Sequence, residues 1–101
     1  MNERQFQFEW DDLKAAGNLR KHRVSFEQAS TVFSDPRILS MADLEHSETE
    51  ERWLAIGLAS NGALLSIIYV VPEFDPDATN IRLISAREAT QTEVQDYEEN
   101  L

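Results

Sequence analysis

The hydrophobic and polar residues of this chain alternate in short blocks whose period changes several times. In the first block, Phe6, Phe8 and Trp10 alternate with polar residues. This two-residue period is typical of a half-buried strand. We therefore expect a strand over residues 6–10.

A helical pattern follows over residues 12–22. Two consecutive aspartates at its start can cap the helix, because a carboxylate accepts hydrogen bonds from the first free backbone N–H groups. Leu13, Ala16 and Leu19 recur at helical spacing. We expect these three side chains to face inward.

A second helix is predicted to begin at Ser25. Ser25 and Gln28 have the spacing of a capping box, and Pro36 ends the helix after Phe33. The two helices would form a helical hairpin, with residues 20–23 at its elbow.

From residue 38 onward the pattern changes to that of strands. Strands are expected over residues 38–43, 52–59, 63–71 and 81–85. Asn61-Gly62 has the composition of a two-residue hairpin turn. Residues 64–71 are apolar on both faces, which predicts a central strand.

A last amphipathic helix is predicted over residues 87–98, with Ser85 and Glu88 as its capping box. The element order β-α-α-β-β-β-β-α predicts an α+β fold with an antiparallel, mostly meander sheet, an N-terminal helical hairpin and a C-terminal helix. With the helices on one face, the opposite face would be free for a ligand. Residues 1–101 would form one domain.

The composition narrows the function classes. The chain has 101 residues and no cysteine, which suits a reducing cytoplasm. Its longest apolar run, residues 63–71, is too short to span a membrane, and residues 1–10 do not resemble a secretory signal. The net charge of −10 opposes long-range attraction to nucleic acid. However, residues 1–23 hold five basic and four acidic residues, so a local basic site can coexist with an acidic remainder.

The absence of several short motifs argues against further kinds of functional site. Residues 73–80 carry aspartates, but they lack the glycine and glutamate positions of a calcium-binding EF-hand loop. His22 and His46 lack a metal-binding spacing. There is also no glycine-rich phosphate loop and no nucleophile elbow. We expect no cofactor and no metal site.

Cationic and proton-transferring side chains remain as candidates for chemistry. They are Lys21, His22, Arg52, Tyr69, Arg82 and Arg87. Metal-free RNA cleavage needs such a set: a base for the 2′-hydroxyl proton, a cation for the phosphorane and an acid for the leaving 5′-oxygen. Arginine suits the second role because its planar fork binds phosphate through two hydrogen bonds.

Each candidate also has a purely structural interpretation. Arg52 and Arg82 could be ion-pair partners on an acidic surface. Lys21 could be a solvated helix residue, and His22 a helix C-terminal cation. Tyr69 could belong to the sheet, and Arg87 could pair with Glu88 or another carboxylate of the last helix. Composition and spacing alone leave the function open.

The chain resembles the BrnT family of ribonuclease toxins in four segments. The first is FEWDDLKAAGNLRKHRVSFEQA, residues 8–29, which holds the Lys21-His22 pair. The others are His46-Ser47, residues 51–57 with Glu51-Arg52 and Ile56-Gly57, and IRLISAREAT, residues 81–90. These segments cover nearly the whole chain in the same order and spacing as in the family.

The resemblance implies a RelE/ParE-like fold and a metal-independent endoribonuclease. It also implies an operon partner of the BrnA type, a ribbon-helix-helix antitoxin that covers the active face and is itself the only link to DNA. The site residues that it implies are Lys21, His22, Arg52, Arg82 and Arg87, with Glu27 and Tyr69 as weaker candidates. Arg52 and Arg82 would stabilise phosphate charge, and Lys21 or His22 would transfer protons.

Two hypotheses follow for the function. The first is a toxin that cleaves RNA. The second is a toxin-like module that pairs with an antitoxin without cleaving RNA, and it is motivated by the net charge and by the acidic segment that begins with Glu88.

Overall fold

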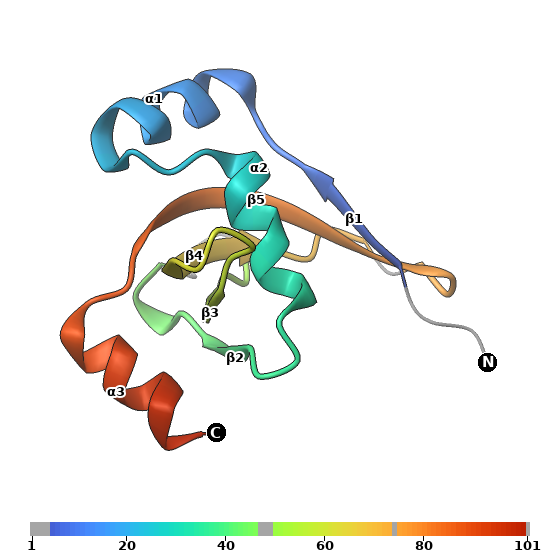
Figure 1. Cartoon of the computed structure of the whole chain (residues 1–101). Coiled ribbons are helices and arrows are strands. Elements are labelled where there is room, and N and C mark those ends of the chain that lie inside the picture. Colours follow the sequence, from blue (N-terminus) through green and yellow to red (C-terminus); the bar gives the residue numbers. More distant parts are fainter. Residues whose placement is uncertain (1–4, 47–49, 74, 101) are drawn as a thin grey trace.

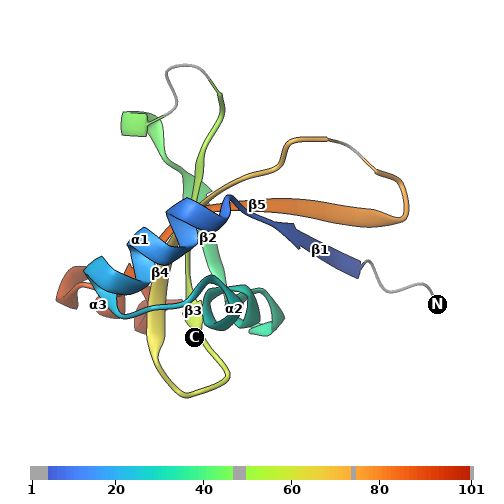
Figure 2. The same ribbon diagram turned by 90° about the horizontal axis from the view of Figure 1, so that it is seen from above.

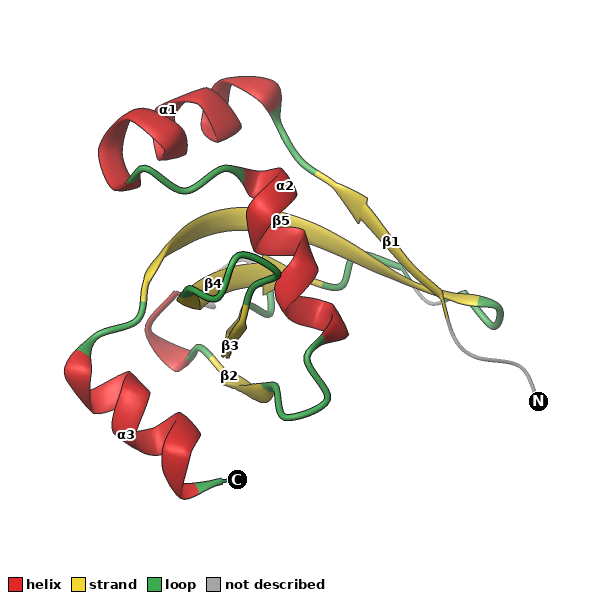
Figure 3. Cartoon of the chain, viewed as in Figure 1, coloured by secondary structure: helices red, strands yellow, loops and turns green. Residues whose placement is uncertain are grey.

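The computed structural model describes residues 5–46, 50–73 and 75–100, which form a five-stranded sheet with helices on both sides (Figure 1, Figure 3). The strands are β1 (Gln5–Glu9), β2 (Leu39–Ala42), β3 (Trp53–Leu58), β4 (Leu64–Val70) and β5 (Ala78–Glu88). The helices are α1 (Asp12–His22), α2 (Phe26–Ser30) and α3 (Gln91–Glu99), with 3-10 turns η1 (Thr31–Ser34) and η2 (Leu44–His46).

The strand order β1-β5-β4-β3-β2 confirms the meander and places the apolar strand β4 in the centre. The expectation of an antiparallel sheet is wrong for one strand, because β1 pairs with β5 in parallel, with Phe8 opposite Ile81. The sheet is therefore mixed, and Figure 2 shows β1 alongside β5. The alternation in β1 predicts a strand but does not indicate its partner or its direction.

The β3–β4 hairpin is present, but its turn is one residue longer than predicted. Ala59 donates its N–H to the carbonyl of Ala63 at 2.8 Å, so Ser60, Asn61 and Gly62 form the connection. Gly62 has φ +89°, a conformation that glycine adopts without strain. A turn that ends in such a glycine matches the twist of the two strands.

Local capping signals fix the starts of the first two helices. The Asp11 carboxylate accepts the N–H of Lys14, and the Ser25 hydroxyl accepts the N–H of Gln28, each at 3.0 Å. The helix predicted from Ser25 to Phe33 is divided into α2 and η1, since its last turn tightens to 3-10 geometry.

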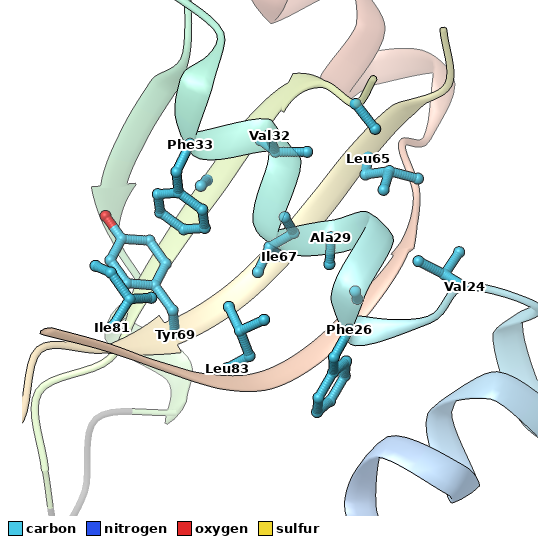
Figure 4. Packing of buried hydrophobic residues seen from close by; sticks show 13 residues of the cluster. Val24, Phe26, Ala29, Val32, Phe33, Leu65, Ile67, Tyr69, Ile81 and Leu83 are labelled. Atoms are coloured by element: carbon cyan, nitrogen blue, oxygen red, sulfur yellow. The ribbon is translucent and has the colours of Figure 1, made fainter. Parts of the chain in front are cut away.

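The main core lies between α2–η1 and one face of the sheet, hereafter the core face (Figure 4). Phe26 and Leu83 are almost completely buried there, and the ring of Phe33 packs edge-on against Tyr69 at a centroid distance of 5.1 Å. Close packing depends on Gly57, because a Cβ at this position would lie 2.6 Å from Cγ1 of Val32.

The predicted inward face of α1 is wrong. Leu13 is 84% exposed and Leu19 is 49% exposed, whereas Asn18 is buried. The Asn18 amide donates hydrogen bonds to the carbonyls of Val24 and Ala86 at 2.8 Å and accepts the N–H of Ala86 at 3.0 Å. Since β1 pairs with β5 only as far as Arg82, the Asn18 side chain takes the place of a strand further along β5.

The final strand and the final helix also differ from the prediction. The strand β5 continues to Glu88, because its pairing with β4 continues as far as Leu65 opposite Glu88. The helix α3 therefore begins at Gln91 instead of Arg87. Its capping box is formed by Thr90 and Glu93, so the predicted box at Ser85 and Glu88 is wrong.

The helix α3 lies on the face of the sheet opposite α1 and α2, hereafter the α3 face (Figure 1). The Ser66 hydroxyl of β4 donates to the Glu93 carboxylate at 3.1 Å, and the Tyr97 hydroxyl donates to Asp35 at 2.6 Å. The helices are thus not all on one face, and α3 covers part of the face that we expected to be free.

We predict that Asn18→Ala lowers the free energy of unfolding by about 2–4 kcal/mol, because it leaves the backbone groups of Ala86 and the carbonyl of Val24 buried without a partner. Urea unfolding followed by circular dichroism measures the change. Leu13→Ala is the control on the same helix, since this side chain is 84% exposed, and it should change stability by less than about 0.5 kcal/mol. Equal losses in the two variants would contradict the bridging role of Asn18.

Candidate functional site

A β-bulge in β5 lies at the centre of the candidate site. Ile68 pairs with Ser85 and the next residue, Tyr69, pairs with Leu83, so Ile84 is an extra residue in β5. In a regular strand, consecutive side chains point to opposite faces. The bulge breaks this alternation, and Ile84 and Ser85 line the same pocket.

The bulge also sets which face the other side chains of β5 occupy. Ile81, Leu83 and Ala86 all belong to the core cluster, although a regular strand would turn Ala86 away from the other two. Arg82 and Arg87 alternate with these core residues and therefore lie on the α3 face. Arg82 and Arg87 are five residues apart. In a strand without a bulge, this odd separation would place them on opposite faces of the sheet.

A pocket lies where α1 meets β5 and the start of β3, hereafter the basic pocket. The described residues that line it are Lys14, Gly17, Asn18, Lys21, His22, Arg52, Ile84 and Ser85. Both lysines of the chain are among them, and none of these lining residues is a carboxylate. In a chain with net charge −10, this pocket gathers positive charge in one place.

Each wall of the basic pocket has a local origin. Lys14, Gly17, Asn18 and Lys21 follow the i, i+3, i+4, i+7 spacing that places residues on one face of a helix. Arg52 directly precedes β3 and enters the pocket from the other side. The Arg52 side chain is 27% exposed, and its guanidinium lies 3.7 Å from Glu50. Three predicted site residues, Lys21, His22 and Arg52, are thus brought together.

Arg82 is not among the described residues that line the basic pocket. It lies opposite Glu9 in the β1–β5 pairing, and its guanidinium contacts that carboxylate at 3.3 Å. The side chains are 42% and 51% exposed, respectively. This ion pair is accessible to water and contributes little to stability. Arg82 thus forms the ion pair expected from its structural interpretation, and Arg52 has the corresponding contact with Glu50.

Arg87 is held more firmly, by a carboxylate of the last helix. Its guanidinium donates to both Glu93 oxygens, at 2.7 and 3.1 Å. Burial would raise the pKa of Glu93, but hydrogen bonds from Arg87, the Thr90 backbone and Ser66 outweigh it and lower that pKa to about 2. The hydrogen bond to Glu93 in turn raises the pKa of Arg87. Arg87 thus joins β5 to α3.

The two weaker candidates lie elsewhere. The Tyr69 ring is 7% exposed and packs on Phe33 on the core face. Glu27 lies exposed on α2 and does not line the basic pocket. The structure does not bring either residue to Lys21, His22 and Arg52.

Among the described residues, no three histidine or carboxylate side chains gather as metal ligands would. The His46 side chain and Ser47 lie outside the described positions. Within the described part of the chain, no helix has the length and apolar character needed to cross a membrane.

Lys14, Gly17 and Ser85 line the pocket but were not among the predicted site residues. The helical spacing from Lys14 to Lys21 was a usable signal, because it places both lysines on one face of α1. Ser85 had no such signal, since the bulge that turns it toward the pocket depends on pairing with β4.

One comparison with known proteins identifies the family of this chain, and a second supports its fold. The family model described as "Ribonuclease toxin, BrnT, of type II toxin-antitoxin system" matches residues 10–93. A search of curated proteins found no match. Among solved structures, the crystal structure of the Brucella abortus ribonuclease toxin BrnT has a TM-score of 0.55 and 20% sequence identity, covering 86% of this chain and 99% of that chain. At this identity, the structural similarity supports the fold alone.

We predict that Glu93→Gln removes part of the acid sensitivity of this protein. The pKa of Glu93 is lowered from 4.5 to about 2 in the fold, so its stabilising contribution is complete above pH 4.5 and is lost as the pH falls toward 2. The variant should be less stable than the parent by about 1–3 kcal/mol at pH 7, and this difference should shrink between pH 4.5 and 2.

Urea unfolding at several pH values between 2 and 7 tests this prediction. Glu98→Gln is a suitable control, because this exposed carboxylate lies on the same helix. Parallel pH curves for the parent and Glu93→Gln would show that the Arg87–Glu93 contact does not control acid stability.

Proposed function

This chain belongs to the BrnT family of ribonuclease toxins of type II toxin-antitoxin systems, and from this premise we propose that it is a metal-independent endoribonuclease. The observation that carries the proposal is the basic pocket, which places Lys21, His22 and Arg52 around one space. These residues supply the charge and the proton transfers that RNA cleavage requires.

The proposed reaction is an internal transfer of the phosphate ester. The 2′-oxygen attacks the adjacent phosphorus, the bond from phosphorus to the 5′-oxygen breaks, and the products carry a 2′,3′-cyclic phosphate and a 5′-hydroxyl. His22 takes the 2′-hydroxyl proton, since imidazole is the most frequent general base in proteins. Lys21 gives a proton to the leaving oxygen, and exchange with water then restores both groups.

Arg52 is the proposed stabiliser of the phosphorane. Its guanidinium is always charged and can bind two phosphate oxygens at once. It is better placed for this role than Arg82, because it lines the same pocket as Lys21 and His22. Arg82 and Arg87 lie on the α3 face and contact Glu9 and Glu93 at 3.3 and 2.7 Å, respectively, so we assign them secondary roles. The contact of Arg52 with Glu50 is longer, at 3.7 Å.

The antitoxin partner follows from the family, because a type II system pairs its toxin with an antitoxin. We propose that this antitoxin is BrnA-like, with a ribbon-helix-helix domain, and that DNA contact occurs only through it. A relation between this fold and that of the RelE toxins stays a prediction.

A second candidate function is an inactive module that binds the antitoxin without cleaving RNA. The carboxylates beside Arg52, Arg82 and Arg87 favour it, since all three predicted catalytic arginines already have anionic partners. This candidate predicts a stable complex with the product of the neighbouring gene and intact RNA.

We predict that the purified chain cleaves single-stranded RNA in the presence of EDTA, and that Arg52→Ala lowers kcat/KM by about 10- to 1,000-fold, as is typical when one donor to a transition-state oxyanion is removed. Arg82→Ala should have a smaller effect, because this residue lies outside the basic pocket. Gel analysis of 5′-labelled RNA gives the rates. It also identifies the cyclic phosphate ends.

Arg37→Ala is the control, because it removes an arginine from the loop before β2, outside the basic pocket. Its cleavage rate should equal that of the parent. Intact RNA with the parent chain, together with a stable antitoxin complex, would overturn the catalytic proposal in favour of the binding module.

A further inference from the structure

Lys14 and Gly17 form part of the basic pocket without any role in the reaction proposed above. Lys14 and Lys21 are seven residues apart on α1, or two turns, so their backbone positions are about 10 Å apart along the helix axis. Gly17 lies between them on the same face and also lines the pocket. The row thus has a positive side chain at each end. In its middle stand Gly17, which has no side chain, and Asn18, whose amide is bonded to the backbone of Val24 and Ala86.

No packing contact requires a glycine at position 17. A Cβ placed there would meet only Nη2 of Arg20, at 3.8 Å, which is an ordinary contact distance. Alanine would therefore fit, and it would favour the helix, because glycine is a poor residue for a helix interior. The glycine instead leaves the surface of α1 open beside Lys21.

Charge at this surface favours an extended anion. Lys14 is exposed and lies on the pocket together with Lys21, His22 and Arg52, and none of the described lining residues is acidic. Its backbone N–H is already used by the Asp11 cap, so its ammonium group is the part available to a ligand. A polyanion that passes over Gly17 can contact both lysines at once.

We propose that Lys14 binds an RNA phosphate beside the scissile one, and that Gly17 leaves space for the sugar-phosphate backbone between Lys14 and Lys21. This inference rests on the proposed ribonuclease function and specifies its substrate as a single strand that follows α1 over more than one phosphate. Lys14 is a substrate-binding residue in this assignment and takes no part in proton transfer.

Binding to a single-stranded RNA with 2′-O-methyl groups at every position tests the proposal, because this probe cannot be cleaved at its 2′-oxygens. Fluorescence anisotropy gives Kd over a series of NaCl concentrations. Lys14→Gln should weaken binding about tenfold at low salt and reduce the slope of log Kd against log salt by about 0.7, the value for one lost phosphate contact on a single strand. Arg37→Gln removes the same charge outside the pocket and should leave the slope unchanged.

The variant Gly17→Ala tests whether Gly17 leaves space for the RNA backbone or has only a structural role in the helix. We expect this variant to unfold at a higher urea concentration than the parent and yet to bind the RNA several-fold more weakly. A gain in stability with unchanged RNA affinity would overturn the role of Gly17. An unchanged slope in Lys14→Gln, or an equal change in Arg37→Gln, would overturn the role of Lys14.

Substrate length distinguishes this inference from the proposed activity. A dinucleoside monophosphate carries only the scissile phosphate, so Lys14→Gln should match the parent in kcat/KM on this substrate and raise KM only on longer RNA. If the parent cleaves both substrates and Lys14→Gln behaves like it on both, the inference fails while the activity stands. If the parent binds the methylated RNA through Lys14 but cleaves no RNA, the activity fails while the binding assignment stands.

Discussion

The pairing between β4 and β5 is the constraint on which the site depends. One extra residue at Ile84 lets Ile81, Leu83 and Ala86 all enter the core. The same shift brings Ser85 to the basic pocket. A regular strand could not satisfy both requirements, because its side chains alternate strictly between faces. Core packing and the candidate site are thus two consequences of one irregularity in the sheet.

The site also depends on the Asn18 amide, because this side chain fixes the position of α1, the helix that carries most of the basic pocket. Since β1 pairs with β5 only as far as Arg82, the edge of β5 near Ala86 would otherwise expose its backbone N–H and carbonyl. Asn18 satisfies both groups and holds α1 against the edge. Polar docking of this kind leaves the opposite side of α1, including Leu13, in contact with water.

Sequence patterns predicted the elements whose causes are local. Ser25 caps α2 and Gly62 ends the β3–β4 turn because each signal acts within a few residues. The parallel partner of β1, the bulge at Ile84 and the true cap of α3 at Thr90 depend on pairing between distant segments. For the same reason, the pattern could suggest the predicted site residues but could not show which of them share a pocket.

The net charge of −10 is a weaker argument against RNA binding than the composition suggests. At physiological salt, charges on the surface act over about 8 Å, so carboxylates beyond that range are largely screened from a phosphate in the basic pocket. Inside the pocket, both lysines and Arg52 act at close range, and no described lining residue is acidic. Glu50, 3.7 Å from Arg52, is a carboxylate beside the pocket that lies within this range. The remaining negative surface repels RNA that approaches elsewhere. An acidic exterior and a basic pocket therefore act together, because the first restricts where an RNA strand can bind and the second gives it one place to do so.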